Sequence, residues 1–366
     1  MAFFNSSAST GPGAAAEKDI EMGDPPTDSI SSMSFSGIAD YLAVGSWDNS
    51  VRIYEVGAGG QSQGKAMYNH EVTSEGPVLS VCWNKEGNKV FSGGADNAGR
   101  ITMPPIKVVK WIDTPQAQIL ATGSWDKTIK AYPFCMLYIA PSDFIFSTGT
   151  YARQLQSRLS SFRSAVIVRM TLAVDVQFPL MVVGTAERHI QIFNLSNPTT
   201  PYKTMVSPLK WQTRVVSCFT ASTNSGFAVG SVEGRVAIQY VEDKDSGNNF
   251  SFKCHRRDST PTSKDGAIVF AVNDISFHPV HGTFSTCGAD GSIHFWDKDA
   301  RNRLKSFEAA PGPISTTTFN RNGSIFAYAV SYDWSKGHSG MTPGHPNKLM
   351  LHACKDDEVK KRPRKV

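Results

Sequence analysis

The fold is decided by the stretch Leu42-Ala43-Val44-Gly45-Ser46-Trp47-Asp48-Asn49-Ser50-Val51-Arg52-Ile53, in which two apolar strand patterns flank one tight turn. Just upstream, Met33 and Phe35 alternate with serines, so both apolar side chains face one side of a strand. Asp48 and Asn49 favour a turn because their side chains bond local backbone, and apolar and polar residues then alternate on the returning strand. The pattern predicts a β-meander.

An apolar strand, an acidic turn residue and an alternating strand recur in this order along the chain. The acidic turn residues are Asp48, Asp96, Asp126, Glu187, Glu233, Asp290 and Asp333. Four-stranded propeller repeats have a period of about 40 to 45 residues, and three of the six intervals between these acids, 48, 46 and 43 residues, are close to it. Because one blade cannot bury both of its faces, the sequence predicts an all-β, seven-bladed β-propeller in which the acids have a structural role in the turns.

Two intervals depart from the period, 30 residues from Asp96 to Asp126 and 61 residues from Asp126 to Glu187. Residues 101–105 stand where an alternating strand is expected, and residues 133–171 have no clear repeat pattern. We therefore expect blades two and three to be irregular as encoded, with the second truncated. We interpret both segments as altered exon use or a mistaken gene model, which sequencing of the transcript tests; the alternative is a damaged third blade.

The two ends of the chain differ in composition from the repeats. Residues 1–28 are rich in Ser, Gly, Ala and Pro and are expected to be a mostly disordered tail, with residues 19–22 as an exception. The propeller is expected to span residues 29–354 and to close by pairing residues 348–352 with a strand around Ile20. Residues 355–366 are expected to be a basic tail, in which the run from Lys360 to Lys365 matches either an import signal or a nucleic-acid contact.

Several classes of protein are disfavoured by the sequence. No apolar run reaches the roughly 20 residues that a membrane span needs, and the N-terminus lacks the pattern of a secretory signal. The six cysteines have no metal-binding or disulfide spacing, so neither a metal nor another cofactor is expected. The recurrent Ser-Trp-Asp contains residue types of a hydrolase triad, but the acids recur once per repeat and no nucleophile elbow is present. The protein is therefore not expected to be an enzyme; the alternative, a propeller hydrolase or sugar-binding enzyme, needs converging carboxylates in the central channel.

Cationic and aromatic residues gather in two places. The first group surrounds Phe252 and the second follows Trp296. The cations in these groups are Lys253, His255, Arg256 and Arg257, and then Lys298, Arg301, Arg303 and Lys305. Such clusters bind acidic peptides or nucleic-acid backbones by charge attraction and stacking, although ordinary solvated loop charge is the alternative interpretation.

On these residues the sequence resembles the WD-repeat mRNA export factor family of the nuclear pore, the Rae/Gle family, from about Asp28 to His338. The resemblance rests on long strings rather than on the repeat alone. They are residues 76–83 (GPVLSVCW), 185–188 (TAER), 233–238 (EGRVAI), 252–256 (FKCHR), 277–283 (FHPVHGT), 296–301 (WDKDAR) and 331–338 (SYDWSKGH).

The resemblance implies a WD-repeat propeller that is a non-enzymatic adaptor in nuclear export of mRNA. It implies docking on the GLEBS segment of a Phe-Gly nucleoporin, contact with RNA or ribonucleoprotein, and a monomer located in the nucleus and at the nuclear pore complex with a cytoplasmic fraction. The alternative is a mitotic spindle checkpoint propeller that binds GLEBS-bearing checkpoint proteins. The implied partner- or RNA-binding residues are Arg235, Phe252, Lys253, Arg256, Trp296, Lys298, Arg301 and Arg303, with Arg235 and the 296–303 segment favoured.

Overall fold

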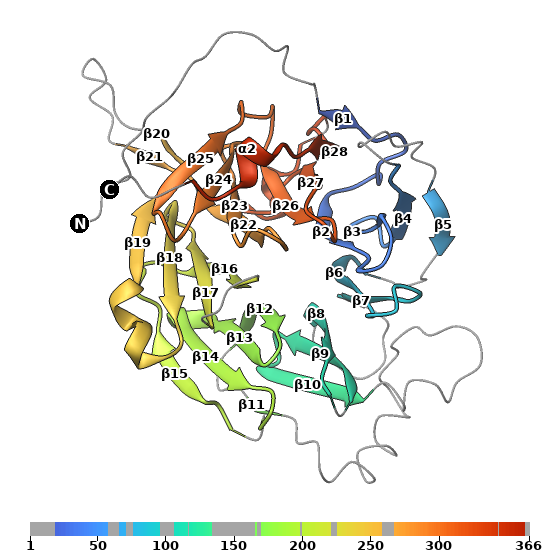
Figure 1. The fold of residues 1–366 in the computed structure, drawn as a ribbon. Coiled ribbons are helices and arrows are strands. Elements are labelled where there is room, and N and C mark those ends of the chain that lie inside the picture. Colours follow the sequence, from blue (N-terminus) through green and yellow to red (C-terminus); the bar gives the residue numbers. More distant parts are fainter. Residues whose placement is uncertain are drawn as a thin grey trace.

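The computed structural model describes residues 19–57, 66–70, 76–95, 106–115, 117–133, 165–166, 170–197, 200–220, 225–257, 267–342 and 344–362 (Figure 1). The expectations for Asp96, residues 101–105 and most of residues 133–171 fall outside this range. Nearly all regular structure in the described residues is β-strand, and none of their helices is long and apolar enough to cross a membrane.

The strands form a ring of antiparallel sheets around a central axis (Figure 1). Six of the sheets have four strands each, and we number them as blades in chain order. The first blade is β2 (Ile30–Phe35), β3 (Tyr41–Ser46), β4 (Val51–Glu55), β5 (Ala66–His70); the third β8 (Ile106–Asp113), β9 (Gln118–Ser124), β10 (Thr128–Pro133), β11 (Ala165–Val166); the fourth β12 (Thr171–Gln177), β13 (Leu180–Thr185), β14 (His189–Asn194), β15 (Lys203–Val206); the fifth β16 (Thr213–Cys218), β17 (Gly226–Ser231), β18 (Arg235–Tyr240), β19 (Phe250–Lys253); the sixth β22 (Val272–Phe277), β23 (Phe284–Gly288), β24 (Ile293–Asp297), β25 (Asn302–Ser306); and the seventh β26 (Ile314–Phe319), β27 (Ile325–Val330), β28 (Lys348–Ala353), β1 (Ile20–Glu21).

The place of the second blade is filled by a two-stranded sheet, β6 (Val78–Trp83) and β7 (Val90–Gly94). The first strands of the sheets contact one another in sequence around the ring, β2, β6, β8, β12, β16, β22, β26 and back to β2. The all-β propeller fold is therefore confirmed, with six complete blades and a second place that holds two strands in the described residues. A separate hairpin, β20 (Arg256–Arg257) and β21 (Ile268–Val269), extends from the connection between blades five and six.

Burial follows the alternation of the strands, because each sheet packs its apolar side chains against the next. Met33 and Phe35 on β2 are buried, while Ser32 and Ser34, which alternate with them, are partly exposed. The carboxylate of Asp175 on β12 links neighbouring inner strands. It accepts a hydrogen bond from Lys110 Nζ on β8 and another from the backbone N–H of Cys218 on β16, both at 2.7 Å. Apolar packing between blades, together with such bonds, stabilises the closed ring.

Every inner strand carries a β-bulge near its start. The bulged residues are Ser31, Leu79, Lys107, Leu172, Arg214, Asn273 and Ser315. A bulge changes the direction of a side chain relative to plain alternation. These seven residues surround the ring axis at the end where the inner strands begin, which we call the rim end.

The ring closes where β1 pairs with β28, with Ile20 opposite Leu351. The backbone N–H of Met22 donates to the carbonyl of Leu349 at 2.8 Å, and the Met22 side chain is buried. The predicted pairing of residues 348–352 with a strand around Ile20 is therefore confirmed. The expected propeller boundary at residue 29 is wrong, because the strand that completes the seventh blade begins at Ile20.

Residues 355–362, the described part of the expected basic tail, pack against the propeller. They begin with the short helix α2 (Asp356–Val359), which contacts β24 and β25 (Figure 1). Val359 is 3% exposed, and its carbonyl accepts a hydrogen bond from Thr283 Oγ1 at 2.7 Å. The buried side chain of Val359 therefore anchors this segment to the sixth blade. The many charged residues around Val359 in the sequence do not predict this contact.

Candidate partner-binding surfaces

Four of the predicted turn acids bond the backbone of their own turns. In each case a carboxylate oxygen accepts the N–H of the residue two positions later. The pairs are Asp48 with Ser50 (3.0 Å), Asp126 with Thr128 (2.9 Å), Asp290 with Ser292 (3.2 Å) and Asp333 with Ser335 (3.1 Å). This bond explains why a short acidic residue recurs at the position. Glu187 lies in a left-handed turn with φ 60°, and Glu233 Oε2 lies 3.7 Å from Arg235 Nε.

Phe252 and Trp296 form part of the interior between blades five and six. Each side chain is 3% exposed, and their ring centroids are 4.6 Å apart. Phe252 occupies the inward position of β19, between the exposed Ser251 and Lys253. The expectation that these two rings contact a partner is therefore wrong, since the neighbouring blade covers them.

Trp296 also belongs to a buried hydrogen-bond chain that joins the two blades. Its indole N–H donates to Thr286 Oγ1 at 2.9 Å, and His255 Nε2 lies 3.0 Å from the same oxygen. His255 Nδ1 lies 2.9 Å from Asp290 Oδ1. Burial alone would raise the pKa of Asp290, but its bonds to His255 and Ser292 outweigh burial and hold that pKa at about 2.

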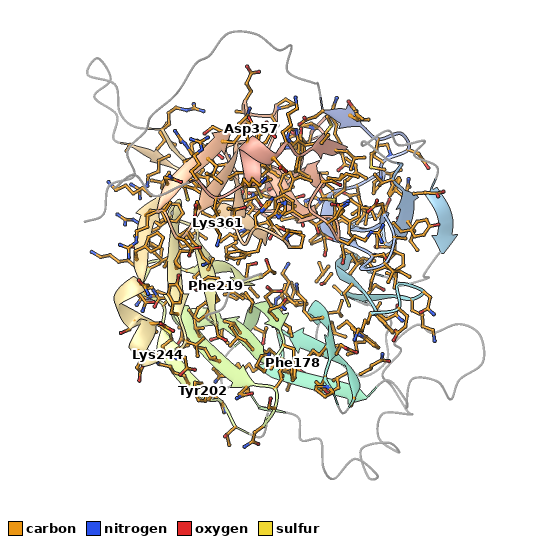
Figure 2. All side chains as sticks on the ribbon, in the orientation of Figure 1. Phe178, Tyr202, Phe219, Lys244, Asp357 and Lys361 are labelled. Atoms are coloured by element: carbon orange, nitrogen blue, oxygen red, sulfur yellow. The ribbon has the colours of Figure 1, made fainter. Side chains whose placement is uncertain are left out.

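Lys298 is enclosed as well. Its side chain is 3% exposed, and Nζ lies 4.8 Å from the ring centre of Phe219 (labelled in Figure 2) and 5.7 Å from that of Tyr240. The ammonium pairs with Asp299 Oδ1 at 2.6 Å. Lys298 therefore cannot present its charge to a phosphate, and the expectation for it is wrong.

Arg301 and Arg303 remain available on the same blade, at the end opposite the rim. Arg301 stands in the turn before β25, with its guanidinium 4.8 Å from the ring centre of Phe250 on the fifth blade. Arg303 is exposed on β25, 5.9 Å from the Trp296 ring. Within the described residues neither guanidinium has a carboxylate partner. Both guanidinium groups lie over aromatic rings, a position that leaves their N–H donors for a ligand.

Arg235, Lys253 and Arg256 lie at the rim end of the fifth blade. Arg235 and Lys253 are opposite each other on β18 and β19. Arg256 Nη2 donates to the carbonyl of Glu233 at 3.1 Å, while the exposed Lys253 has no carboxylate partner in the described part of the chain. The carboxylate of Glu233 pairs only with Arg235 in the described residues, so the three cations leave the local charge positive.

We call the five cations Arg235, Lys253, Arg256, Arg301 and Arg303 the side patch. They lie on β18, β19 and β20 at the rim end, and on β25 and the turn before it at the opposite end. Phe252 on β19 and Trp296 on β24 pack against each other between the two blades.

Sequence reasoning missed a second cationic place, at the bulges of the rim end. Lys107 and Arg214 occupy two of the seven bulge positions. Arg214 Nη2 donates to the carbonyl of Asp333 at 2.8 Å, and Lys107 pairs with no carboxylate of the described residues. The protein packed around the ammonium and, second, the charge of Arg214 lower the pKa of Lys107 to about 8. Aligning the repeats on the second residue of each inner strand is the signal that identifies these residues.

Exposed aromatic side chains surround this cationic place. Trp211, in the loop before β16, is 61% exposed, and Trp125, after β9, is 36% exposed. Trp47 stacks on Trp334 with ring centroids 3.7 Å apart. Neither Trp125 nor Trp211 is part of the apolar core. We call Lys107, Arg214 and these four tryptophans the rim surface.

The described residues contain no group of three or more His, Cys, Asp or Glu side chains placed to hold a metal ion. The chemistry that the two surfaces offer is charge attraction, cation–π contact and apolar burial. Each of these suits recognition of a peptide or a phosphate backbone.

Comparison with known proteins places the chain among close relatives. The WD domain, G-beta repeat family matches residues 22–55, 63–101 and 263–297. The chain is 49% identical to the mRNA export factor GLE2 of Chaetomium thermophilum over 95% of this chain and 93% of that protein. It is 45% identical to the Poly(A)+ RNA export protein of Schizosaccharomyces pombe (95% and 94% covered) and 40% identical to Protein Rae1 of Drosophila melanogaster (93% and 95% covered).

A solved structure, the crystal structure of the mitotic checkpoint complex, contains a chain with the same fold at a TM-score of 0.61. That chain is 12% identical, with 97% of this chain and 100% of that chain covered, so the likeness concerns the fold alone. The sequence identities, the WD repeats and the ring of sheets agree: the chain belongs to the WD-repeat mRNA export factor family of Gle2 and Rae1.

Proposed function

We propose that this protein is a non-enzymatic adaptor in the nuclear export of mRNA. The observation that carries the proposal is the identity of 49% and 45%, over 95% of the chain, to proteins named as an mRNA export factor and a poly(A)+ RNA export protein. A rigid ring that exposes two separate cationic surfaces is suited to holding two partners at once. The proposed location is the nucleus and the nuclear pore complex, with a cytoplasmic fraction, and the proposed form is a monomeric propeller.

The first proposed partner is the GLEBS segment of a Phe-Gly nucleoporin, docked on the rim surface. Exposed tryptophans provide apolar area for a peptide, as at other interfaces where large aromatic side chains dominate affinity. Lys107 and Arg214 provide positive charge at the centre of the same surface and favour acidic residues in the peptide. A hollow of about 380 Å³ beside Tyr332 and His345 offers further room at this end of the ring.

The second proposed partner is RNA, or ribonucleoprotein, on the side patch. Arg301 and Arg303 are available to phosphates, and Arg235, Lys253 and Arg256 continue the positive charge along the fifth blade. Attraction to a phosphate backbone depends on salt, because binding releases condensed counterions. Added salt would therefore weaken the binding of the two partners to different extents.

A mitotic checkpoint role, with the rim surface holding a GLEBS-bearing checkpoint protein, is compatible with the same geometry. The structural likeness to a chain of the mitotic checkpoint complex supports only the shared fold at 12% identity. The greater identity to mRNA export factors makes export the function we propose.

The test is a calorimetric titration of the purified, folded chain with a GLEBS peptide from a Phe-Gly nucleoporin. Saturable one-to-one binding is expected, and it should be lost in the variant Lys107→Gln/Arg214→Gln. A matched control is Lys85→Gln/Lys244→Gln, which removes the same charge from two exposed positions at the end of the ring opposite the rim end. Failure of the folded chain to bind the peptide would overturn the docking proposal.

A further inference from the structure

The C-terminal segment of residues 355–362 ends beside the side patch. The buried side chain of Val359, at the end of α2, anchors the segment to the sixth blade. Arg362 Nη2 then donates to the carbonyl of Leu304 on β25 at 3.0 Å. Leu304 lies next to Arg303 in sequence, so the segment runs along the strand that carries the side patch. Figure 2 labels Asp357 and Lys361 on this segment.

Lys361 is held at a defined place by the β24–β25 turn. Its Nζ lies 2.6 Å from Asp299 Oδ2, while the enclosed Lys298 holds the other oxygen of the same carboxylate at 2.6 Å. Since Lys298 packs against Phe219 and Tyr240, Asp299 cannot move freely. The ammonium of Lys361 is thereby fixed at Asp299, which precedes Arg301 by two residues in sequence.

The acidic groups around this segment are mostly paired, and two of the pairs use Lys360 and Lys361 of the segment itself. Asp356 pairs with Lys360 at 2.8 Å, and Glu358 pairs with His352 at 2.9 Å and with Lys305 at 3.2 Å. Asp357 is exposed and is the exception. Arg301, Arg303 and Arg362, by contrast, have no carboxylate partner in the described residues, so positive charge prevails at this end of the patch.

We propose that Lys360, Lys361 and Arg362 are the far end of the same surface and contact the phosphates of the single-stranded RNA that Arg301 and Arg303 bind. This inference rests on the proposed RNA contact of the side patch. Proteins that bind single strands commonly place cations along a track with aromatic rings beside it. Here α2 acts as the anchor that aligns the C-terminal cations with that track.

The test is fluorescence anisotropy of the full chain with a labelled oligouridine of about 15 nucleotides, titrated over a series of salt concentrations. The variant is Lys360→Gln/Lys361→Gln/Arg362→Gln. Each lost phosphate contact lowers the slope of log K against log salt by about 0.7 on a single strand, so a fall of about 2 is expected, with affinity about tenfold lower at low salt. The matched control, Lys85→Gln/Lys127→Gln/Lys130→Gln, removes three cations from blades two and three and should bind nearly as the natural chain does.

A second variant separates position from charge. Val359→Ser keeps every cation but removes the apolar anchor, so it should lower RNA affinity in the same direction while leaving net charge unchanged. If Val359→Ser binds RNA as tightly as the natural chain while the triple variant binds more weakly, the anchoring role of Val359 is overturned. If the triple variant itself binds as tightly as the natural chain, the whole inference is overturned. If the natural chain fails to bind oligouridine at all, the proposed RNA function itself fails; if Arg301→Glu/Arg303→Glu weakens binding while the triple variant does not, only the C-terminal inference fails.

Discussion

His352 Nδ1 lies 2.7 Å from Asp19 Oδ1, although 333 residues separate the two in sequence. The other ring nitrogen, Nε2, lies 2.9 Å from Glu358 Oε2. One imidazole thus joins the first described residue, the last strand of the propeller and the C-terminal helix. Burial alone would lower the pKa of His352, but the two carboxylates outweigh it and raise that pKa to about 9, so the ring is protonated at neutral pH.

His352→Gln should therefore destabilise the protein in a way that depends on pH. The pKa of the folded state lies above the ordinary value of 6.5, so the stabilisation is fully present below about pH 6.5 and is lost as pH rises through about 9. We expect the free energy of unfolding to fall by about 2 kcal/mol at about pH 6, and by much less at about pH 10. Denaturant unfolding at the two pH values measures this, with the exposed His338→Gln as control. An equal loss at both values would show that the charge of the ring is unimportant.

Charge reversal at the exposed end of the side patch should weaken RNA binding without lowering thermal stability. Arg301→Glu/Arg303→Glu replaces attraction to phosphates by repulsion at two positions that have no carboxylate partner in the described structure. We expect RNA affinity at low salt to fall roughly tenfold or more, and log K for RNA to depend less steeply on log salt. Lys127→Glu/Lys130→Glu is the matched control on the third blade. Unchanged binding across the salt series would remove these two arginines from the interface.

The rim surface and the side patch should respond independently to substitution. Trp211→Ala removes a side chain that is 61% exposed, so we expect a change in stability within about 0.5 kcal/mol. If the tryptophan anchors a peptide, affinity for the GLEBS peptide should fall by about 2 kcal/mol or more. Affinity for oligouridine should stay the same. Calorimetry with peptide and anisotropy with RNA on one preparation give both readouts, and parallel losses of the two ligands would contradict separate sites.

Trp296 should affect folding rather than recognition. Trp296→Phe removes the indole N–H that donates to Thr286 Oγ1 and leaves a buried hydroxyl with one partner fewer. The expected cost is about 1 to 2 kcal/mol in the free energy of unfolding, from one buried hydrogen bond. RNA affinity per folded molecule should be unchanged. A comparison with Trp211→Phe, whose ring is exposed, isolates the effect of burial; loss of RNA binding in a fully folded Trp296→Phe would restore this ring to the binding surface.

Much of the architecture could be predicted from local patterns. Alternation on either side of Asp48 and Asp290 predicts paired strands and a turn that the acid closes, and both acids bond their own turns in the structure. The pairing of Ile20 with Leu351 was also predictable, because a ring needs its last blade completed by the other end of the chain. These features depend on neighbours in sequence or on the requirement of closure, so the pattern suffices.

The availability of each cation and aromatic ring was not predictable in the same way. Lys298 and Arg301 are three residues apart and both are cationic, yet Phe219 and Tyr240 of the neighbouring blade enclose Lys298, whereas Arg301 is only partly buried. Lys107 and Arg214 belong together only because bulges bring distant repeats to one rim. The sequence by itself determined the blades, their turns and the closure of the ring, since those follow from local alternation and chain connectivity. The tertiary structure alone decided which charged and aromatic side chains are free to bind, because the packing of one blade against the next sets their burial and their partners.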